Sequence, residues 1–199
     1  MIRNIAISLL RKAIVLAIGL GIILLIGYFA SDRKDYPGKA QFEKVDSLIT
    51  TSSGGIAHGD SDEARAAASA FAASMKTMQA SSFSGGSGRS FATGGDFLTY
   101  VKRTPNAVVI LCHVPELRNY KDEKTRGALA QIAWSAGKAA VAKISDVKDS
   151  DKLIIGLRGF GSYGPIWEGT VSGNATKKTD DLDEKKRLYP FFVEGGQGA

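Results

Sequence analysis

The longest uninterrupted run of hydrophobic residues lies near the N-terminus. Residues 13–30 read AIVLAIGLGIILLIGYFA and contain no charged side chain. As an α-helix this run would be about 27 Å long, close to the thickness of the hydrocarbon core of a bilayer. A soluble helix usually keeps a polar face, and a cleaved signal peptide has a shorter hydrophobic region with small residues at its cleavage site. We therefore predict an uncleaved transmembrane helix at residues 13–30, preceded by an N-terminal flank, residues 1–12.

The charges beside this helix bear on its orientation. Arg11 and Lys12 adjoin its first turn without a neighbouring acidic residue, whereas basic and acidic residues are mixed on the other side. Lys and Arg are retained preferentially on the cytoplasmic side of a membrane. The total number of basic residues near the two ends is almost equal, so the prediction rests on Arg11 and Lys12. We expect a cytoplasmic N-terminus and an extracytoplasmic C-terminal domain.

The next segment, residues 31–94, is polar and contains several Gly- and Ser-rich runs. This composition is typical of a flexible stalk. Inside it we expect an Ala-rich helix at about residues 60–80, because Asp60 and Glu63 form an N-terminal capping signal. A shorter helix over residues 40–49 is consistent with the spacing of its apolar residues. The apolar positions of the two helices are Phe71, Met75 and Met78 in the first, and Phe42, Val45 and Ile49 in the second.

The hydrophobic pattern of residues 95–199 predicts a compact α+β domain. Residues 106–114 read NAVVILCHV, a run typical of a buried strand. A long helix follows, and the small residues on its apolar stripe would let it lie close to a sheet. Further strands are expected at KLIIGLRGF, PIWEGTV and LYPFFVEG. This order of elements indicates a small, mostly antiparallel sheet packed by one long helix.

The overall composition is that of a globular protein. Of the 199 residues, 44% are hydrophobic and 23% are charged. The formal net charge of +6 is distributed without a concentrated basic stripe, so we expect no nucleic-acid partner. Cys112 is the single cysteine, which excludes an intramolecular disulfide.

A glycine-rich stretch follows the strand expected at KLIIGLRGF. Gly159, Gly161 and Gly164 satisfy the pattern G-x-G-x-x-G. A dinucleotide-binding loop of this type must lead into a helix, yet residues 165–171 have the composition of a strand. The protein-kinase loop also needs lysine, catalytic and metal-binding segments that this sequence lacks. We therefore predict the turn of a β-hairpin and no bound cofactor.

Three aromatic residues accompany this turn: Phe160, Tyr163 and Trp167. Large aromatic side chains at an exposed tip are typical of a surface that binds a partner. The sequence thus favours a single-pass, membrane-anchored binding or accessory module without enzymatic activity. We expect it to contact the lipid bilayer through residues 13–30 and to bind a membrane or envelope protein.

The alternative is a membrane-anchored hydrolase or thiol enzyme that uses Cys112 and His113, with Glu116 as a carboxylate partner. Successive residues of a strand point to opposite faces, so Cys112 and His113 cannot activate one another. A zinc site needs three or four clustered ligands, and the only other histidine, His58, lies in the expected stalk. We therefore predict no metal site.

Overall fold

The computed structural model describes residues 36–51, 57–82, 97–114, 123–159, 163–178 and 184–193. Apart from Tyr36, these residues belong to one compact unit, Pro37–Ala199. None of the helices in the described segments is long and apolar enough to cross a membrane. The transmembrane helix predicted at residues 13–30 lies outside these segments.

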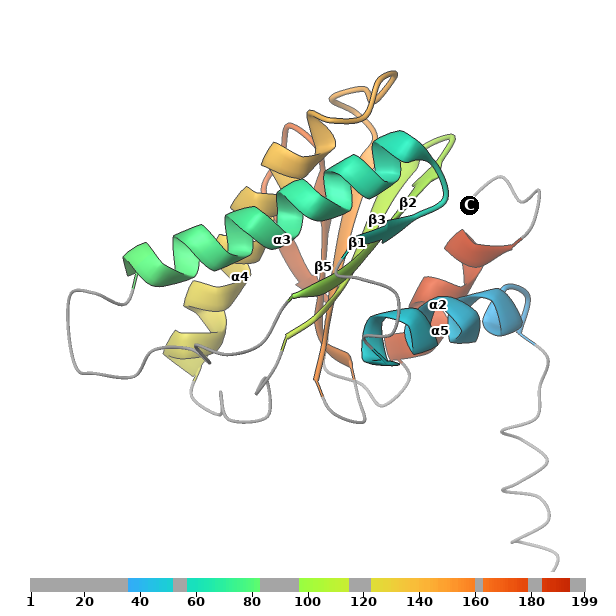
Figure 1. Ribbon diagram of the computed structural model, residues 1–199, viewed down its shortest axis with the longest axis horizontal. Coiled ribbons are helices and arrows are strands. Elements are labelled where there is room, and N and C mark those ends of the chain that lie inside the picture. Colours follow the sequence, from blue (N-terminus) through green and yellow to red (C-terminus); the bar gives the residue numbers. More distant parts are fainter. Residues whose placement is uncertain are drawn as a thin grey trace, which may run out of the picture. The chain divides into compact units, whose positions relative to one another are not determined.

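Six strands of the described residues form one sheet, and their order in the sheet is their order in the chain (Figure 1). The strands are β1 (Ala57–Gly59), β2 (Leu98–Thr104), β3 (Ala107–His113), β4 (Lys152–Arg158), β5 (Tyr163–Thr170) and β6 (Thr176–Lys178). β2 and β3, β4 and β5, and β5 and β6 are antiparallel. β1 and β2, and β3 and β4, are parallel. The predicted α+β class is confirmed, but the sheet is mixed.

Each parallel pair of strands is connected by a helix. α3 (Asp62–Ser82) follows β1, and α4 (Glu123–Val141) follows β3. Such a connection is required because two parallel strands run in the same direction. The chain must therefore return to the end of the sheet where the first strand began before the second strand can start. Both helices contribute to the same hydrophobic core and cover the same face of the sheet (Figure 1). Two long helices therefore pack this face, where the sequence predicts one.

α3 is the Ala-rich helix predicted at about residues 60–80, but it belongs to the folded unit instead of a flexible stalk. Ala64, Ala67 and Phe71 are completely buried in the core. Alanine has little apolar surface of its own, so an Ala-rich stretch resembles a linker in the sequence. In the fold the same small side chains let the helix backbone approach the sheet and α4 closely. The folded unit accordingly begins near Pro37 and not at residue 95.

The opposite face of the sheet is covered by α2 (Lys39–Thr51), α5 (Glu184–Leu188) and the 3₁₀ helix η2 (Tyr189–Phe192), as Figure 1 shows. α2 is the predicted shorter helix, and it buries the apolar positions that its periodicity indicates. The ring centroid of Phe42 lies 5.2 Å from that of Tyr189 and 5.3 Å from that of Phe192. These edge-to-face contacts join the first and last described helices of the unit.

The C-terminal segment differs from its prediction as a strand. LYPFF contributes the end of α5 and all of η2. Pro190 suits the first turn of a helix, because it has no amide hydrogen to donate and its φ angle is fixed near the helical value. Tyr189 and Phe192 are both buried at a spacing of three residues. In a 3₁₀ helix, residues three positions apart lie on the same side, so both rings are buried together. In a strand the same two residues would point to opposite faces.

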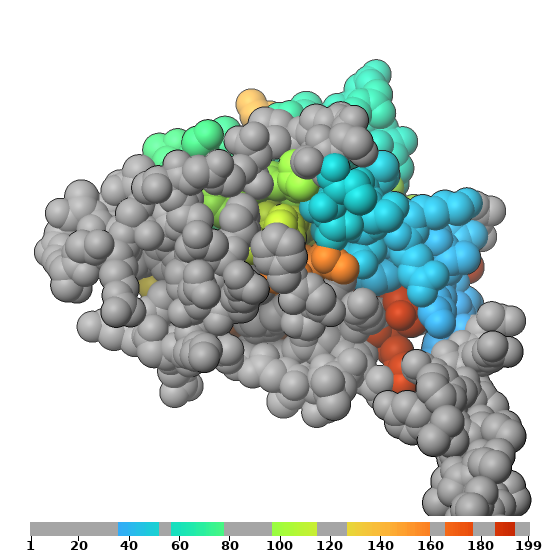
Figure 2. All heavy atoms as spheres, turned by 60° about the horizontal axis from the view of Figure 1, so that its bottom comes forward, coloured from blue at the N-terminus to red at the C-terminus, as the bar shows by residue number. Residues whose placement is uncertain are grey.

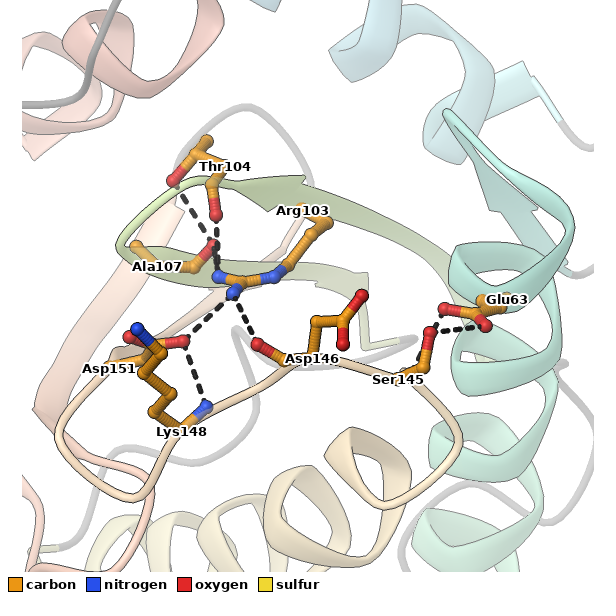
Figure 3. A network of polar contacts seen from close by, with 8 residues as sticks. All are labelled: Glu63, Arg103, Thr104, Ala107, Ser145, Asp146, Lys148 and Asp151. Carbon is orange, nitrogen blue, oxygen red and sulfur yellow. Dashed lines mark hydrogen bonds and ion pairs between the residues drawn. The ribbon is translucent and has the colours of Figure 1, made fainter.

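An ion pair between Arg103 and Asp151 connects β2 to the loop that precedes β4. Nη2 of Arg103 lies 2.8 Å from Oδ2 of Asp151 and donates a hydrogen bond of 3.1 Å to the carbonyl oxygen of Asp146 (Figure 3). The backbone N–H of Lys148 also donates to Oδ2 of Asp151, at 3.0 Å. The Asp151 carboxylate is buried and accepts from these two donors, so it fixes the amino end of β4 against the β2–β3 hairpin.

We expect Asp151→Ala to lower the free energy of unfolding by about 2 kcal/mol, because it leaves the Arg103 guanidinium largely buried without its carboxylate. Urea unfolding of the full chain in detergent measures this change. Asp149→Ala, at an exposed position of the same loop, is the control and should change stability by less than about 0.5 kcal/mol. Equal effects of the two substitutions would show that the ion pair contributes no specific stability.

Small residues on the inner face of α4 let it pack close to the sheet, as the sequence predicts. Ala133, Ala136 and Ala140 are completely buried. A Cβ atom placed on Gly137 would lie 2.5 Å from Cδ1 of Ile155 in β4. Ile155 is itself fully buried, so it has little room to move. The glycine is therefore required by the distance between the helix and the sheet.

Gly127→Ala and Gly137→Ala form a matched pair within α4. A Cβ atom on Gly127 would meet nothing within 4 Å, so alanine there should stabilise the protein by about 0.5–1 kcal/mol through its helix propensity. At Gly137 crowding against Ile155 should outweigh this gain and destabilise the protein by about 1 kcal/mol. Chemical unfolding compares the two variants. A similar increase in stability for both would contradict close packing of α4.

Candidate functional site

The carboxyl ends of the parallel strands β3 and β4 bring three side chains together. His113 ends β3, Arg158 ends β4, and the two residues are direct neighbours in the register of the sheet. Asp46 reaches Arg158 from α2. Ligand sites of sheets with helical crossovers commonly lie beyond the carboxyl ends of parallel strands, because the loops that follow the strands meet there. We call His113, Arg158 and Asp46 the carboxyl-edge cluster.

Arg158 and Asp46 form a two-point ion pair. Nε of Arg158 lies 2.5 Å from Oδ1 of Asp46, and Nη2 donates a hydrogen bond of 2.9 Å to Oδ2. Each side chain is only 14% exposed, so solvent screens their attraction little. In Figure 2, orange atoms of β4 lie beside the blue-to-cyan atoms of α2. The planar fork of an arginine suits the two oxygens of a carboxylate, and here the Nη2–Oδ2 contact is a hydrogen bond whereas the Nε–Oδ1 contact is a close ion pair without hydrogen-bond alignment.

His113 has a pKa below its ordinary value of 6.5. Burial is the main cause, the positive charge of Arg158 adds to it, and the negative charge of Asp46 opposes it. The imidazole is therefore neutral at neutral pH and can both donate and accept a hydrogen bond. The carboxyl-edge cluster thus combines a fixed positive charge, a fixed negative charge and a neutral imidazole.

Cys112 does not belong to this cluster. Its side chain is completely buried in the core formed with α3 and α4. The Thr99 hydroxyl donates to its sulfur over 3.5 Å, and burial raises the pKa of the thiol to about 12. His113 is the next residue of β3, so its side chain points to the opposite face of the sheet. The two residues therefore do not form a nucleophile with its base.

The other predicted site residues do not come together in the described structure. Glu116 and Phe160 lie outside the described residues. Tyr163 is the first residue of β5. Trp167 lies inside β5 opposite Ile155 and packs, partly buried, against the core under α4. Trp167 therefore lies within strand β5 on the packed face of the sheet, and the binding role of Phe160, Tyr163 and Trp167 stays a prediction.

The glycine-rich stretch connects two antiparallel strands, as the sequence predicts. β4 ends just before Gly159, and the chain returns as β5 from Tyr163. The register shifts between Gly156 and Arg158, which is a bulge or irregularity of the kind that glycine in a strand often marks. Because a strand and not a helix follows the glycines, no helix N-terminus is available there for a pyrophosphate.

Sequence reasoning did not identify Asp46 or Arg158. The two residues are 112 positions apart, and neither belongs to a recognisable motif. A weak signal is present in α2, where Asp46 directly follows Val45 on the side of the helix that packs on the sheet. His58, which the sequence places in a stalk, lies in β1 opposite Tyr100 of β2. Within the described segments no three His, Cys, Asp or Glu residues are grouped to hold a metal ion.

Comparisons of the chain with protein-family models, with curated proteins and with solved structures gave no match. Its function must therefore be inferred from its own sequence and geometry.

We expect His113 to make the folded unit less stable as the pH falls. The folded state holds the pKa of His113 below 6.5, so the neutral imidazole contributes stability above this value. That contribution is lost progressively as the pH decreases from about 6.5 toward the lower pKa of the folded state. Urea unfolding between about pH 7.5 and pH 5.5 measures the slope.

His113→Gln should flatten this slope, because glutamine does not titrate. His58→Gln is the matched control, since it removes the other histidine of the chain and leaves the His113 contribution in place. A slope that persists in His113→Gln would show that another group causes it.

Proposed function

We propose that this chain is a membrane-anchored binding module without enzymatic activity. Residues 13–30 hold it in a lipid bilayer, and the unit that begins at Pro37 binds a membrane or envelope protein. Arg11 and Lys12 favour a cytoplasmic N-terminus, with the folded unit on the extracytoplasmic side.

The main support for binding is the carboxyl-edge cluster. The strands hold Arg158 and His113 in place at their carboxyl ends, and a partner would bind these side chains in exchange for present contacts such as that of Arg158 with Asp46. A thiol enzyme instead needs a thiolate within reach of a base. The pKa of Cys112 is raised to about 12 and its side chain is buried on the other face, so a nucleophilic Cys112 has no support in this geometry.

The short connection to the predicted anchor also matters for the proposed partner. The folded unit begins at Pro37, so residues 31–36 alone would tether it to the anchor. Six residues span at most about 20 Å when fully extended. A tether of this length favours partners that are themselves in, or close to, the membrane.

We expect the full chain to sediment with membranes, to resist extraction with alkaline carbonate, and to dissolve in detergent. Two arginines in the middle of the apolar run, Leu20→Arg with Ile22→Arg, should shift it to the supernatant, because each costs about 3 kcal/mol in the centre of a transmembrane helix. Leu48→Arg is the control, since Leu48 is an exposed apolar residue of α2. Wild-type protein in the supernatant would contradict the anchor, and protease treatment of intact cells tests the orientation.

A further inference from the structure

The partners in the carboxyl-edge cluster come from different parts of the fold. Arg158 and His113 end two hydrogen-bonded strands of the sheet, so their positions are fixed by the strand register. Asp46 belongs to α2, a helix that is separated from both strands in sequence and packs on the sheet from outside. Arg158 and His113 are therefore held by the paired strands of the sheet, whereas the Asp46 carboxylate belongs to a separate helix, α2.

The hydrophobic contacts of α2 do not by themselves require a carboxylate at position 46. Its neighbours Phe42, Val45 and Ile49 are buried and already dock α2 by hydrophobic contact. Burying an ion pair costs desolvation energy, and a well-packed apolar pair is often equally or more stable. Asp46 thus adds a polar contact to a helix that already docks through an apolar surface, and another carboxylate could compete with Asp46 for Arg158.

The contact has the geometry of a carboxylate-binding site. Nη2 of Arg158 donates a hydrogen bond to Oδ2 of Asp46, Nε lies 2.5 Å from Oδ1 as an ion-pair contact, and His113 is the cross-strand neighbour of Arg158. An aspartate or glutamate of another protein could make the same two-point contact, because only the carboxylate takes part in it. Beyond residue 30 the chain has 23 basic and 20 acidic residues, a formal net charge of +3, and this small excess of positive charge favours an acidic partner.

We propose that Arg158 and His113 form a binding site for a carboxylate of an acidic protein segment, and that Asp46 occupies this site as an internal competitor. This inference rests on the binding function proposed above and names the chemistry of the partner. An incoming carboxylate displaces Asp46 from Arg158 and loosens the polar attachment of α2. Binding and α2 docking are consequently coupled, and each weakens the other.

The test is a titration of the full chain in detergent with a fluorescently labelled hexaglutamate peptide, followed by anisotropy. Asp46→Asn keeps the size of the side chain but removes the competing charge, so we expect the peptide to bind about tenfold more tightly than to the wild type. Asp46→Asn with Arg158→Gln should lose this gain. Glu43→Gln is the control, because Glu43 is an exposed acidic residue of the same helix.

Two further measurements separate a specific site from general attraction. Arg158→Lys in the Asp46→Asn background keeps the charge but lacks the planar fork, and it should bind about tenfold more weakly than Asp46→Asn alone. A hexalysine peptide should not bind. Unfolding curves establish that each variant is folded. If Asp46→Asn does not fold, the test is Arg158→Gln in the otherwise unchanged chain, which should abolish the peptide binding of the wild type.

The inference is overturned if Asp46→Asn binds the peptide like the wild type, or if Glu43→Gln gives the same gain. It is also overturned if Arg158→Gln leaves the binding unchanged. These outcomes are distinct from failure of the proposed membrane anchor, which fractionation detects independently of peptide binding.

Discussion

Two parallel neighbours such as β3 and β4 cannot be joined by a tight turn, so the chain between them has to return along one face of the sheet. α4 makes this return, and its small inner residues allow it to lie directly on β4. The same pairing places the last residues of both strands at one edge, which is how His113 comes to lie beside Arg158. The candidate site is thus a direct result of the connection that builds the core.

Polar contacts act at both ends of β4, with different physical roles. At its amino end, Asp151 joins Arg103 and backbone donors in a buried network. Nearby, Glu63 at the start of α3 accepts two hydrogen bonds from Ser145, at 3.0 Å and 2.7 Å, which hold the α4–β4 loop against that helix. These contacts connect the loop that precedes β4 to β2 and to α3. At the carboxyl end of β4, the Arg158 contact instead holds a helix that packs from the other face.

The two faces of the sheet are packed by different means. On the face covered by α3 and α4, buried alanines and Gly137 let the helix backbones approach the sheet closely, beside larger buried side chains such as Phe71 and Trp134. α2 and η2 use aromatic rings that meet edge to face, as Phe42 does with Tyr189 and Phe192.

Local patterns in the sequence determined the elements that depend on neighbouring residues. The apolar spacing of α2, the buried run of β3, the antiparallel return after Gly159 and the opposite directions of Cys112 and His113 all follow from periodicity or from glycine and proline chemistry. Only the tertiary structure decided that α3 belongs to the core, that two strand pairs are parallel and that Asp46 meets Arg158. Alanine-rich sequence is compatible with both a linker and a closely packed helix. An ion pair between residues 112 positions apart leaves no local pattern, because its existence depends on how distant elements are placed in space.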